Sequence, residues 1–416
     1  MSESREDIDR LHVAPSYEEF LERYLKPNQP VIIGQDLINT WPALREWTVQ
    51  AGSSREINWD YLFQVYGHQD VSVSDCSQVD PFGNLECETA KFRDVVAKWQ
   101  KGEGQSLYVK DWHLARSIES TTGSGTATSS GSLPFYTTPD IFADDWMNAW
   151  YSAHTSDDFR FVYVGAAGTL TPLHRDVYCS YSWSTNIYGR KRWWLFPPHQ
   201  TQYLFMRSRR TCVHDVRNVD PVQFPDFARA RPIVLEQDAG ETIFVPSGWY
   251  HQVENLTACI SINHNWCNST NLPMLYASMC EKVAEVEEAL EDVRDMLRAS
   301  HPEDERAWKT EFREVVQQLV QHDAGWNWLT FWKMVLYALE SASRQEDLPG
   351  IIKNDSSPKL LFPCAPRDLR PPLSFIRQQI APCYQDFIHR DRFECEGEVL
   401  ATVEELRNLL HIEDSP

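Results

Sequence analysis

The centre of the chain, residues 159–266, constrains the fold most, because short β-branched and aromatic runs alternate there with turn residues. The runs are F-R-F-V-Y-V, R-W-W-L-F, E-T-I-F-V-P, W-Y-H-Q-V and C-I-S-I-N, and Pro, Gly and Asn separate them. Many short strands with this spacing are typical of an antiparallel barrel or a jelly roll. We therefore expect a double-stranded β-helix of the jelly-roll type over 159–267.

The flanking segments favour helices, which makes the predicted fold class α+β. A helix is expected to start at Ser16, which has Glu19 three residues later as in a capping box, and to stop at Pro27. After Asn268 the apolar residues take helical spacing. The prediction is a jelly-roll core with a helical N-terminal segment and a helical C-terminal region.

The expected domain organisation has four parts. Residues 1–15 are expected to be disordered, and residues 16–158 to form an N-terminal α/β segment packing on the barrel. Within that segment, residues 119–132 are rich in Gly, Ser and Thr and predict a flexible loop. The barrel core over 159–267 is then followed by the helical C-terminal region over 268–416.

Charge and cysteine usage restrict the class of partner. The chain has 39 Lys and Arg against 60 Asp and Glu, a net charge of −21. That balance argues against general nucleic-acid binding and favours a basic protein or peptide as partner. The N-terminus has no apolar signal core, no apolar run is long enough to span a membrane, and the ten cysteines form no C-x-x-C pair. We expect a cytoplasmic protein, with the nucleus as the alternative, and reduced thiols.

The segment T-P-L-H-R-D contains the first candidate metal ligands, His174 and Asp176. Residues i and i+2 of a strand point to the same side, so both side chains can reach one ion. His251, 77 residues later at the start of another expected strand, supplies a third ligand. Two histidines and one carboxylate are the facial set of non-haem Fe(II) oxygenases.

The H-x-D pattern by itself is weak evidence, because most such pairs are solvated. It also occurs at His68 and at His389. Only the His174 pair lies in the strand-rich centre with a Gly/Pro turn leading to another histidine. This context favours it over the other two.

Lys191 begins the aromatic run of G-R-K-R-W-W-L-F-P-P. A lysine that faces a barrel interior requires an anion, which a dicarboxylate co-substrate would provide. The alternative, in which Lys191 faces solvent as its neighbours must, is equally open on these grounds.

Taken together, these motifs resemble the JmjC family of Fe(II)- and 2-oxoglutarate-dependent oxygenases. The matching pieces are T-P-L-H-R-D, G-R-K-R-W-W-L-F-P-P, A-G-E-T-I-F-V-P-S-G-W-Y-H-Q-V-E-N-L and I-S-I-N-H-N-W, in that order. The segments S-L-Y-V-K-D-W-H-L, D-D-F-R-F-V-Y and S-W-S-T-N-I-Y-G-R-K are similar to those of a lysyl-hydroxylase subgroup. The resemblance covers about residues 15–345 and implies a cupin-like core.

The resemblance also implies roles for individual residues. His174, Asp176 and His251 would hold Fe(II), and Lys191 would pair with the distal carboxylate of 2-oxoglutarate. The remaining two assignments are Thr171, bonded to that same carboxylate, and Asn265, near the co-substrate. For Thr171 a purely structural role on the strand is equally open. Dioxygen would be the second co-substrate.

The function implied is hydroxylation of a lysyl side chain in a protein, with a translation release factor as the target and succinate and CO₂ as co-products. Demethylation of N-methyl-lysine is the alternative with the same chemistry, and a catalytically silent barrel that only binds is the alternative of another class. No contact with nucleic acid or membrane is expected, and the C-terminal helices offer a homodimer interface. Aromatic candidates for the pocket, with barrel core as the alternative role, are Tyr163, Tyr178, Tyr181, Trp183 and Trp249.

Overall fold

The computed structural model describes residues 8–79, 85–122, 134–207, 211–347, 365–390 and 397–411. The chain forms two compact units. The first, which we call the sheet unit, comprises residues 1–141, 157–176 and 181–265. The second, the helical unit, comprises residues 142–156, 177–180 and 266–416.

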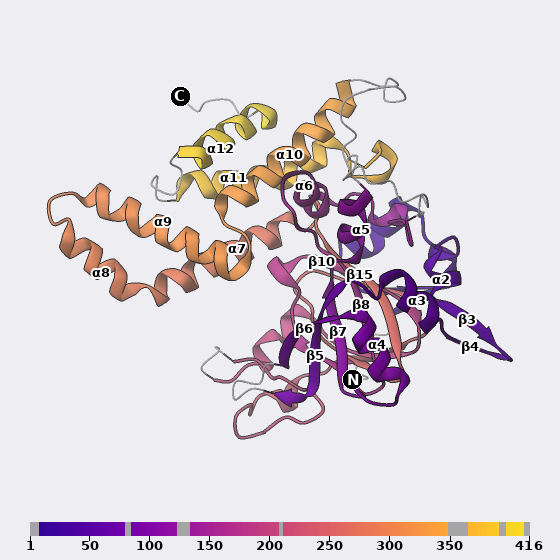
Figure 1. Ribbon diagram of the computed structural model, residues 1–416. Coiled ribbons are helices and arrows are strands. Elements are labelled where there is room, and N and C mark those ends of the chain that lie inside the picture. Colours follow the sequence, from indigo (N-terminus) through magenta and orange to yellow (C-terminus); the bar gives the residue numbers. More distant parts are fainter. Residues whose placement is uncertain are drawn as a thin grey trace, which may run out of the picture. The chain divides into compact units, whose positions relative to one another are not determined.

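Two sheets form the jelly-roll core that the sequence predicts (Figure 1). The larger has nine strands in the order β1-β2-β13-β10-β15-β8-β7-β5-β6. Its strands are β1 (Asp9–Leu11), β2 (Val31–Ile33), β5 (Asp70–Val79), β6 (Leu85–Lys91), β7 (Leu107–Trp112), β8 (Arg160–Gly165), β10 (Tyr181–Tyr188), β13 (Thr242–Val245) and β15 (Cys259–Trp266).

The smaller sheet has the order β12-β11-β14-β9. It contains β9 (Leu170–His174), β11 (Lys191–Phe196), β12 (Ile233–Gln237) and β14 (Tyr250–Asn255). Every pairing within it is antiparallel. A separate hairpin is formed by β3 (Thr48–Ala51) and β4 (Ser54–Ile57).

The hydrophobic core between the sheets holds them face to face. One buried cluster joins Ile32 and Ile243 of the nine-stranded sheet to Trp193, Leu195 and Val253 of the four-stranded sheet. This burial removes apolar surface from water on the inner face of both sheets, which stabilises a two-layer arrangement. A second buried cluster packs Leu204, Val213, Phe224 and Ala230 against residues of β9, β11 and β14.

Short helices complete the sheet unit. They are α1 (Tyr17–Phe20), the π-helix η1 (Leu21–Leu25), α2 (Ala43–Glu46), α3 (Trp59–Tyr66), α4 (Phe92–Gln100) and α5 (Leu114–Thr122), with 3-10 turns η2 (Gln35–Ile38), η5 (Pro198–Tyr203) and η6 (Phe227–Arg229). The predicted cap at Ser16 is confirmed, because its Oγ accepts a hydrogen bond from the amide of Glu19 at 3.2 Å.

The N-terminal part of the chain differs from the prediction in three ways. Residues 9–11, predicted to be disordered, form β1 and pair with β2, while residues 1–7 lie outside the described residues. The predicted 16–158 segment supplies strands to the nine-stranded sheet itself. Residues 119–122 of the predicted loop form the end of α5, and the rest of that loop, 123–132, lies outside the described residues.

The physical reason for the ordered start of the 119–132 segment is an ion pair. Glu119 accepts two hydrogen bonds from the guanidinium of Arg160, at 2.8 and 2.7 Å. Arg160 is only 4% exposed, so the carboxylate of Glu119 neutralises a buried charge. A contact of such long sequence separation cannot be predicted from local composition.

The helical unit contains the helices expected after residue 268. They are α7 (Leu272–Ala289), α8 (Glu291–Ser300), α9 (Glu305–Ala324), α10 (Trp328–Asp347), α11 (Leu373–His389) and α12 (Gly397–Leu410), with the short turn η7 (Arg367–Leu369). The unit also contains α6 (Trp146–His154) and the turn η4 (Val177–Cys179), which precede the predicted helical region. Another 3-10 turn is η3 (Asp140–Phe142). Leu290 separates α7 from α8, and Gly325, whose left-handed φ is +75°, ends α9. Among the described residues, no helix is both long enough and apolar enough to cross a bilayer.

Candidate metal centre

Two neighbouring strands of the four-stranded sheet bring the predicted ligands together. β9 and β14 pair so that the Cα atoms of His174 and His251 lie directly opposite each other. Their imidazole centroids are 4.2 Å apart. One ligand atom from each of His174, Asp176 and His251 lies within 4.8 Å of the other two, a spacing within the reach of a single metal ion.

Hydrogen bonds fix both imidazoles in the tautomer that a metal requires. Nδ1 of His174 donates to the carbonyl of Pro172 at 2.8 Å, and Nδ1 of His251 donates to the carbonyl of Trp249 at 3.2 Å. Because a carbonyl only accepts, each Nε2 keeps its lone pair. Burial and the neighbouring His174 lower the pKa of His251 to about 4. The ring of His251 is therefore neutral at physiological pH.

Asp176 reaches this group in a different way from the one predicted. β9 ends at His174, so Asp176 lies beyond the strand and not on its face. Its carboxylate is oriented by Ser182 of β10, whose Oγ donates to Oδ2 at 2.7 Å. Ser182 was not identified from the sequence, because nothing distinguishes it locally from Ser180 and Ser184 on either side of it.

Lys191 is buried at the start of β11, with 2% of its surface exposed. Its Nζ donates to Ser261 Oγ at 2.9 Å, and burial lowers its pKa to about 8. Within the described residues no carboxylate pairs with this ammonium, so its charge is uncompensated by the chain. The open alternative, in which Lys191 faces solvent, is wrong. A buried ammonium in this position favours an anionic ligand.

A pocket that is open to solvent connects the three candidate ligands with Lys191. Thr171 and Asn265, the two remaining predicted residues, also line it, as do Tyr163 and Trp183. The other aromatic candidates lie elsewhere: Tyr181 donates its hydroxyl to the carbonyl of Leu25, Trp249 packs in the core, and Tyr178 belongs to the helical unit. Further lining residues are Tyr108, Ser182, Ser184, Trp193, Val253 and Asn263.

The competing H-x-D pairs do not form such a group. Asp70 pairs with Lys91 at 2.8 Å, and neither His68 nor His389 belongs to a candidate cluster among the described residues. Asp391 lies outside the described ranges.

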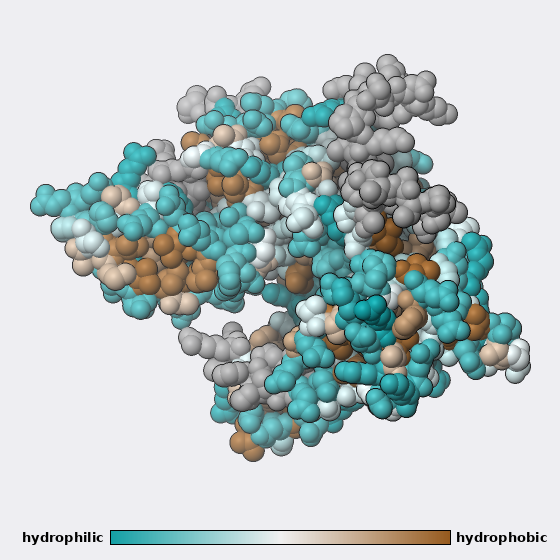
Figure 2. Space-filling model, in the orientation of Figure 1, coloured by the Kyte–Doolittle hydropathy of each residue, from teal (hydrophilic) through white to brown (hydrophobic). Residues whose placement is uncertain are grey.

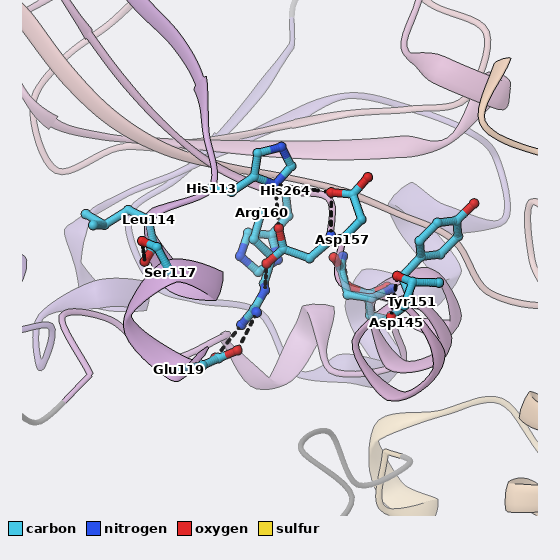
Figure 3. A network of polar contacts seen from close by, with 12 residues as sticks. His113, Leu114, Ser117, Glu119, Asp145, Tyr151, Asp157, Arg160 and His264 are labelled. Atoms are coloured by element: carbon cyan, nitrogen blue, oxygen red, sulfur yellow. Dashed lines mark hydrogen bonds and ion pairs between the residues drawn. The ribbon is translucent and has the colours of Figure 1, made fainter. Parts of the chain in front are cut away.

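A second group of side chains, His113, Asp157 and Asp158, also brings its possible ligand atoms within 4.8 Å of one another. Figure 3 shows the polar network around it. Its contacts, however, are those of an ion-pair network. Asp158 accepts from His113 Nδ1 through Oδ1 at 2.7 Å and from Arg160 Nε through Oδ2 at 2.6 Å. Both oxygens of its carboxylate are therefore occupied, and the cluster is unsuited to a metal in this arrangement.

Comparison with known proteins places this chain in a family. The model of the cupin-like domain family matches residues 17–271, which contain all six predicted site residues. A protein named JmjC domain-containing protein 1 from Schizosaccharomyces pombe is 30% identical over 413 residues, covering 80% of this chain and 84% of the relative. The chain belongs to the JmjC family.

Two further relatives of this JmjC protein carry more specific names. The arginine-specific demethylase JMJ20 of Arabidopsis thaliana is 37% identical over 68% of this chain and 61% of the relative. The 2-oxoglutarate and iron-dependent oxygenase JMJD4 of Gallus gallus is 35% identical over 69% of this chain and 66% of the relative. The chain thus spans slightly less than two thirds of both relatives.

Proposed function

We propose that this JmjC protein is an Fe(II)- and 2-oxoglutarate-dependent oxygenase that hydroxylates a lysyl side chain of a protein. The observation that carries the proposal is the composition of one pocket: two imidazoles with free Nε2 lone pairs, one oriented carboxylate and a buried ammonium for which the described residues supply no acidic partner. The Gallus gallus relative is named a 2-oxoglutarate and iron-dependent oxygenase, which supports the same cofactors here. A translation release factor is the proposed target.

Each group in the pocket has a role in this proposal. His174, Asp176 and His251 would hold the ferrous ion, which with 2-oxoglutarate and O₂ supplies the oxidising chemistry that yields succinate, CO₂ and a hydroxylated side chain. Lys191 and Ser261 would bind the distal carboxylate of 2-oxoglutarate. Thr171 would donate to that same carboxylate. Asn265 lies on the pocket wall near both co-substrates in this assignment.

The remaining lining residues position and shield these groups. Ser182 holds the carboxylate of Asp176 in a single orientation through its hydrogen bond. A metal ligand oriented in this way binds its ion more tightly. The apolar surfaces of Trp193 and Val253 reduce access of water to the pocket. Excluding water protects a reactive intermediate from side reactions.

Demethylation is the second candidate, because the Arabidopsis thaliana relative is named an arginine-specific demethylase. Hydroxylation of an N-methyl group gives a carbinolamine that releases formaldehyde, so the same pocket serves both reactions. A silent binding protein is the third candidate. It would have no use for the oriented carboxylate and the uncompensated ammonium, so we favour an enzyme.

Mass spectrometry distinguishes these candidates. Purified release factor and matched N-methyl-lysine and N-methyl-arginine peptides are incubated with the protein, Fe(II), ascorbate and 2-oxoglutarate. A gain of one oxygen on a lysine supports hydroxylation, and loss of a methyl group supports demethylation. His174→Ala should abolish either reaction while His68→Ala should not. Equal loss in both folded variants would overturn the site.

The proposal extends to assembly and compartment. Figure 2 shows apolar side chains gathered on the visible face of the α8 and α9 region. Met296 of α8 is 61% exposed. We propose a homodimer through these C-terminal helices, which light scattering of the purified protein would detect.

All eight cysteines of the described ranges are free, which suits a cytoplasmic or nuclear location.

A further inference from the structure

Asp111 occupies an unusual backbone position in β7. Its φ of +51° lies in the left-handed region, which Asp tolerates better than most residues other than glycine. The pairing between β7 and β8 shifts register between Val109 and Trp112, so a bulge surrounds Asp111. Bulges of this kind redirect a side chain and are over-represented near active sites.

The redirected carboxylate meets the wall of the pocket. Tyr163 donates its hydroxyl to Asp111 Oδ1 at 2.5 Å, and Tyr163 lines the pocket together with Asp176. Burial and the negative charge of Asp111 raise the pKa of Tyr163 well above its usual value, so the phenol stays protonated and donates. Asp111 is exposed, and no Lys or Arg of the described chain forms an ion pair with it.

The surface beside Asp111 is aromatic. Tyr163 and Phe161 are two residues apart on β8, so their side chains lie on one face, opposite Ser261 and Asn263 of β15. Phe161 meets the ring of His113 edge-on, with 5.0 Å between centroids. Aromatic faces next to a carboxylate suit a side chain with an apolar stem and a cationic end.

Charge is divided between neighbouring strands around the pocket. The ammonium of Lys191 reaches Ser261 on β15, whereas the carboxylate of Asp111 lies on β7, with β8 between them. An anionic co-substrate is attracted to Lys191 and repelled from Asp111, and a cationic substrate group experiences the reverse. This division separates the two binding positions.

We propose that Asp111 is a specificity-determining residue that binds the cationic group of the substrate side chain, with Tyr163 holding its carboxylate in place. The inference rests on the proposed function and names the group that selects the substrate of that same site. In a lysyl side chain the ammonium lies only a few bonds from the carbons available for hydroxylation. A guanidinium would pair with the same carboxylate, so the inference holds for lysyl and arginyl substrates.

The test uses the full chain with Mn(II) in place of iron and with 2-oxoglutarate present. The probes are a blocked pentapeptide with one central lysine and the same peptide acetylated on that lysine. Mn(II) accelerates the NMR relaxation of nearby protons, so it reports whether the lysine ε-methylene enters the pocket. Asp111→Asn keeps the side-chain shape and tolerates the same φ. Asp94→Asn, an exposed change on α4, is the matched control.

The wild type and Asp94→Asn should relax the lysine probe more strongly than the acetylated probe. Asp111→Asn should weaken binding of the lysine probe about five- to tenfold and leave the acetylated probe unchanged. Tyr163→Phe should produce a smaller loss of the same kind. Turnover of 2-oxoglutarate without substrate, measured with Fe(II), should stay within about twofold of wild type in the control Asp94→Asn, because Asp94 is exposed on α4 and does not line the pocket.

Two outcomes overturn the inference, and they differ from failure of the proposed function. Equal relaxation of both probes by the wild type, or undiminished binding in Asp111→Asn, removes Asp111 as the recognition group while the metal site stands. Failure of Mn(II) to bind the wild type, seen in its electron paramagnetic resonance signal, overturns the proposed function and this inference with it.

Discussion

Among the residues of the pocket, Lys191 restricts the ligand most, because its buried ammonium requires an anion. Lys191→Met keeps the apolar stem but removes the charge, so the apparent KM for 2-oxoglutarate should rise about 10- to 100-fold, the usual loss for a charge-assisted hydrogen bond. The measurement is succinate formation against 2-oxoglutarate concentration. Lys98→Met, at an exposed position of α4, is the control and should leave KM unchanged. An unchanged KM in Lys191→Met would remove Lys191 from the co-substrate site.

The pH dependence of 2-oxoglutarate binding provides a second test of Lys191. Burial lowers the pKa of Lys191 to about 8 in the ligand-free protein. The titratable group that acts on Lys191 is the Cys259 thiol, and burial raises the pKa of that thiol. Above pH 8 the amine loses its proton, whereas 2-oxoglutarate remains a dianion. The affinity should therefore be constant below pH 8 and fall up to about tenfold per pH unit above it.

Calorimetry with Mn(II) and 2-oxoglutarate between pH 7 and 9 would measure this dependence. Lys191→Met, which has no group to titrate there, should bind weakly and without that slope. An affinity that rises with pH in the wild type, or the same slope in both proteins, would contradict the assignment. The sign follows from linkage, because binding of the anion favours the protonated amine.

At the scale of elements, the turn between β10 and β11 sets where Lys191 begins its strand. Gly189 in this turn has a φ of +87°, and a Cβ there would collide with the backbone oxygen of Ala258. Gly168, between β8 and β9, has a φ of +85° with nothing near its missing Cβ. The two glycines share the backbone requirement and differ only in the available space.

Gly168→Ala should therefore lower the free energy of unfolding by about 1 kcal/mol. This is the cost of holding an alanine in the left-handed backbone region, with no added steric clash. Gly189→Ala should lower it by about 2 kcal/mol more, because the turn must shift to accept a methyl group. Urea denaturation of both variants checks the difference. Equal losses would show that the turn yields easily and does not fix the start of β11.

Features that depend on neighbouring residues in the sequence could be predicted, and features that depend on contacts between distant residues could not. The helix start at Ser16 was predicted from Glu19 three residues later, and the strands of the centre from β-branched and aromatic runs between turn residues. The predicted placement of His174 and His251 depended on strand alternation and turn residues, which are local signals. Ser182 and Asp111 could not be predicted as site residues, because their roles depend on which strands pair and on one bulge.

The same distinction explains the errors in the N-terminal region. Residues 9–11 fell in the segment predicted to be disordered, yet they form β1, because β2 supplies their backbone partners. The start of the 119–132 segment is ordered by Arg160, which is 41 residues away from Glu119. Pairings of this length carry no signature in the composition of either segment.

For the whole molecule, the net charge of −21 should act on the rate at which a basic protein substrate is captured. Acidic surface attracts a cationic partner over a distance set by the Debye length, about 10 Å at 0.1 M salt. We therefore expect kcat/KM for the protein substrate to fall several-fold between about 20 and 200 mM salt, while kcat changes little, because screening slows encounter and not the bound reaction.

The control for this effect is the KM for 2-oxoglutarate, since Lys191 is buried and its interaction is screened less than a surface charge. Replacing sodium chloride by another monovalent salt at equal ionic strength should give the same decrease, which separates screening from specific ion binding. If kcat/KM is independent of salt over this range, the net charge does not direct the substrate, and recognition depends only on short-range contacts such as that proposed for Asp111. If kcat falls in parallel with kcat/KM, salt is acting on the bound complex or on the fold, and the steering interpretation is wrong.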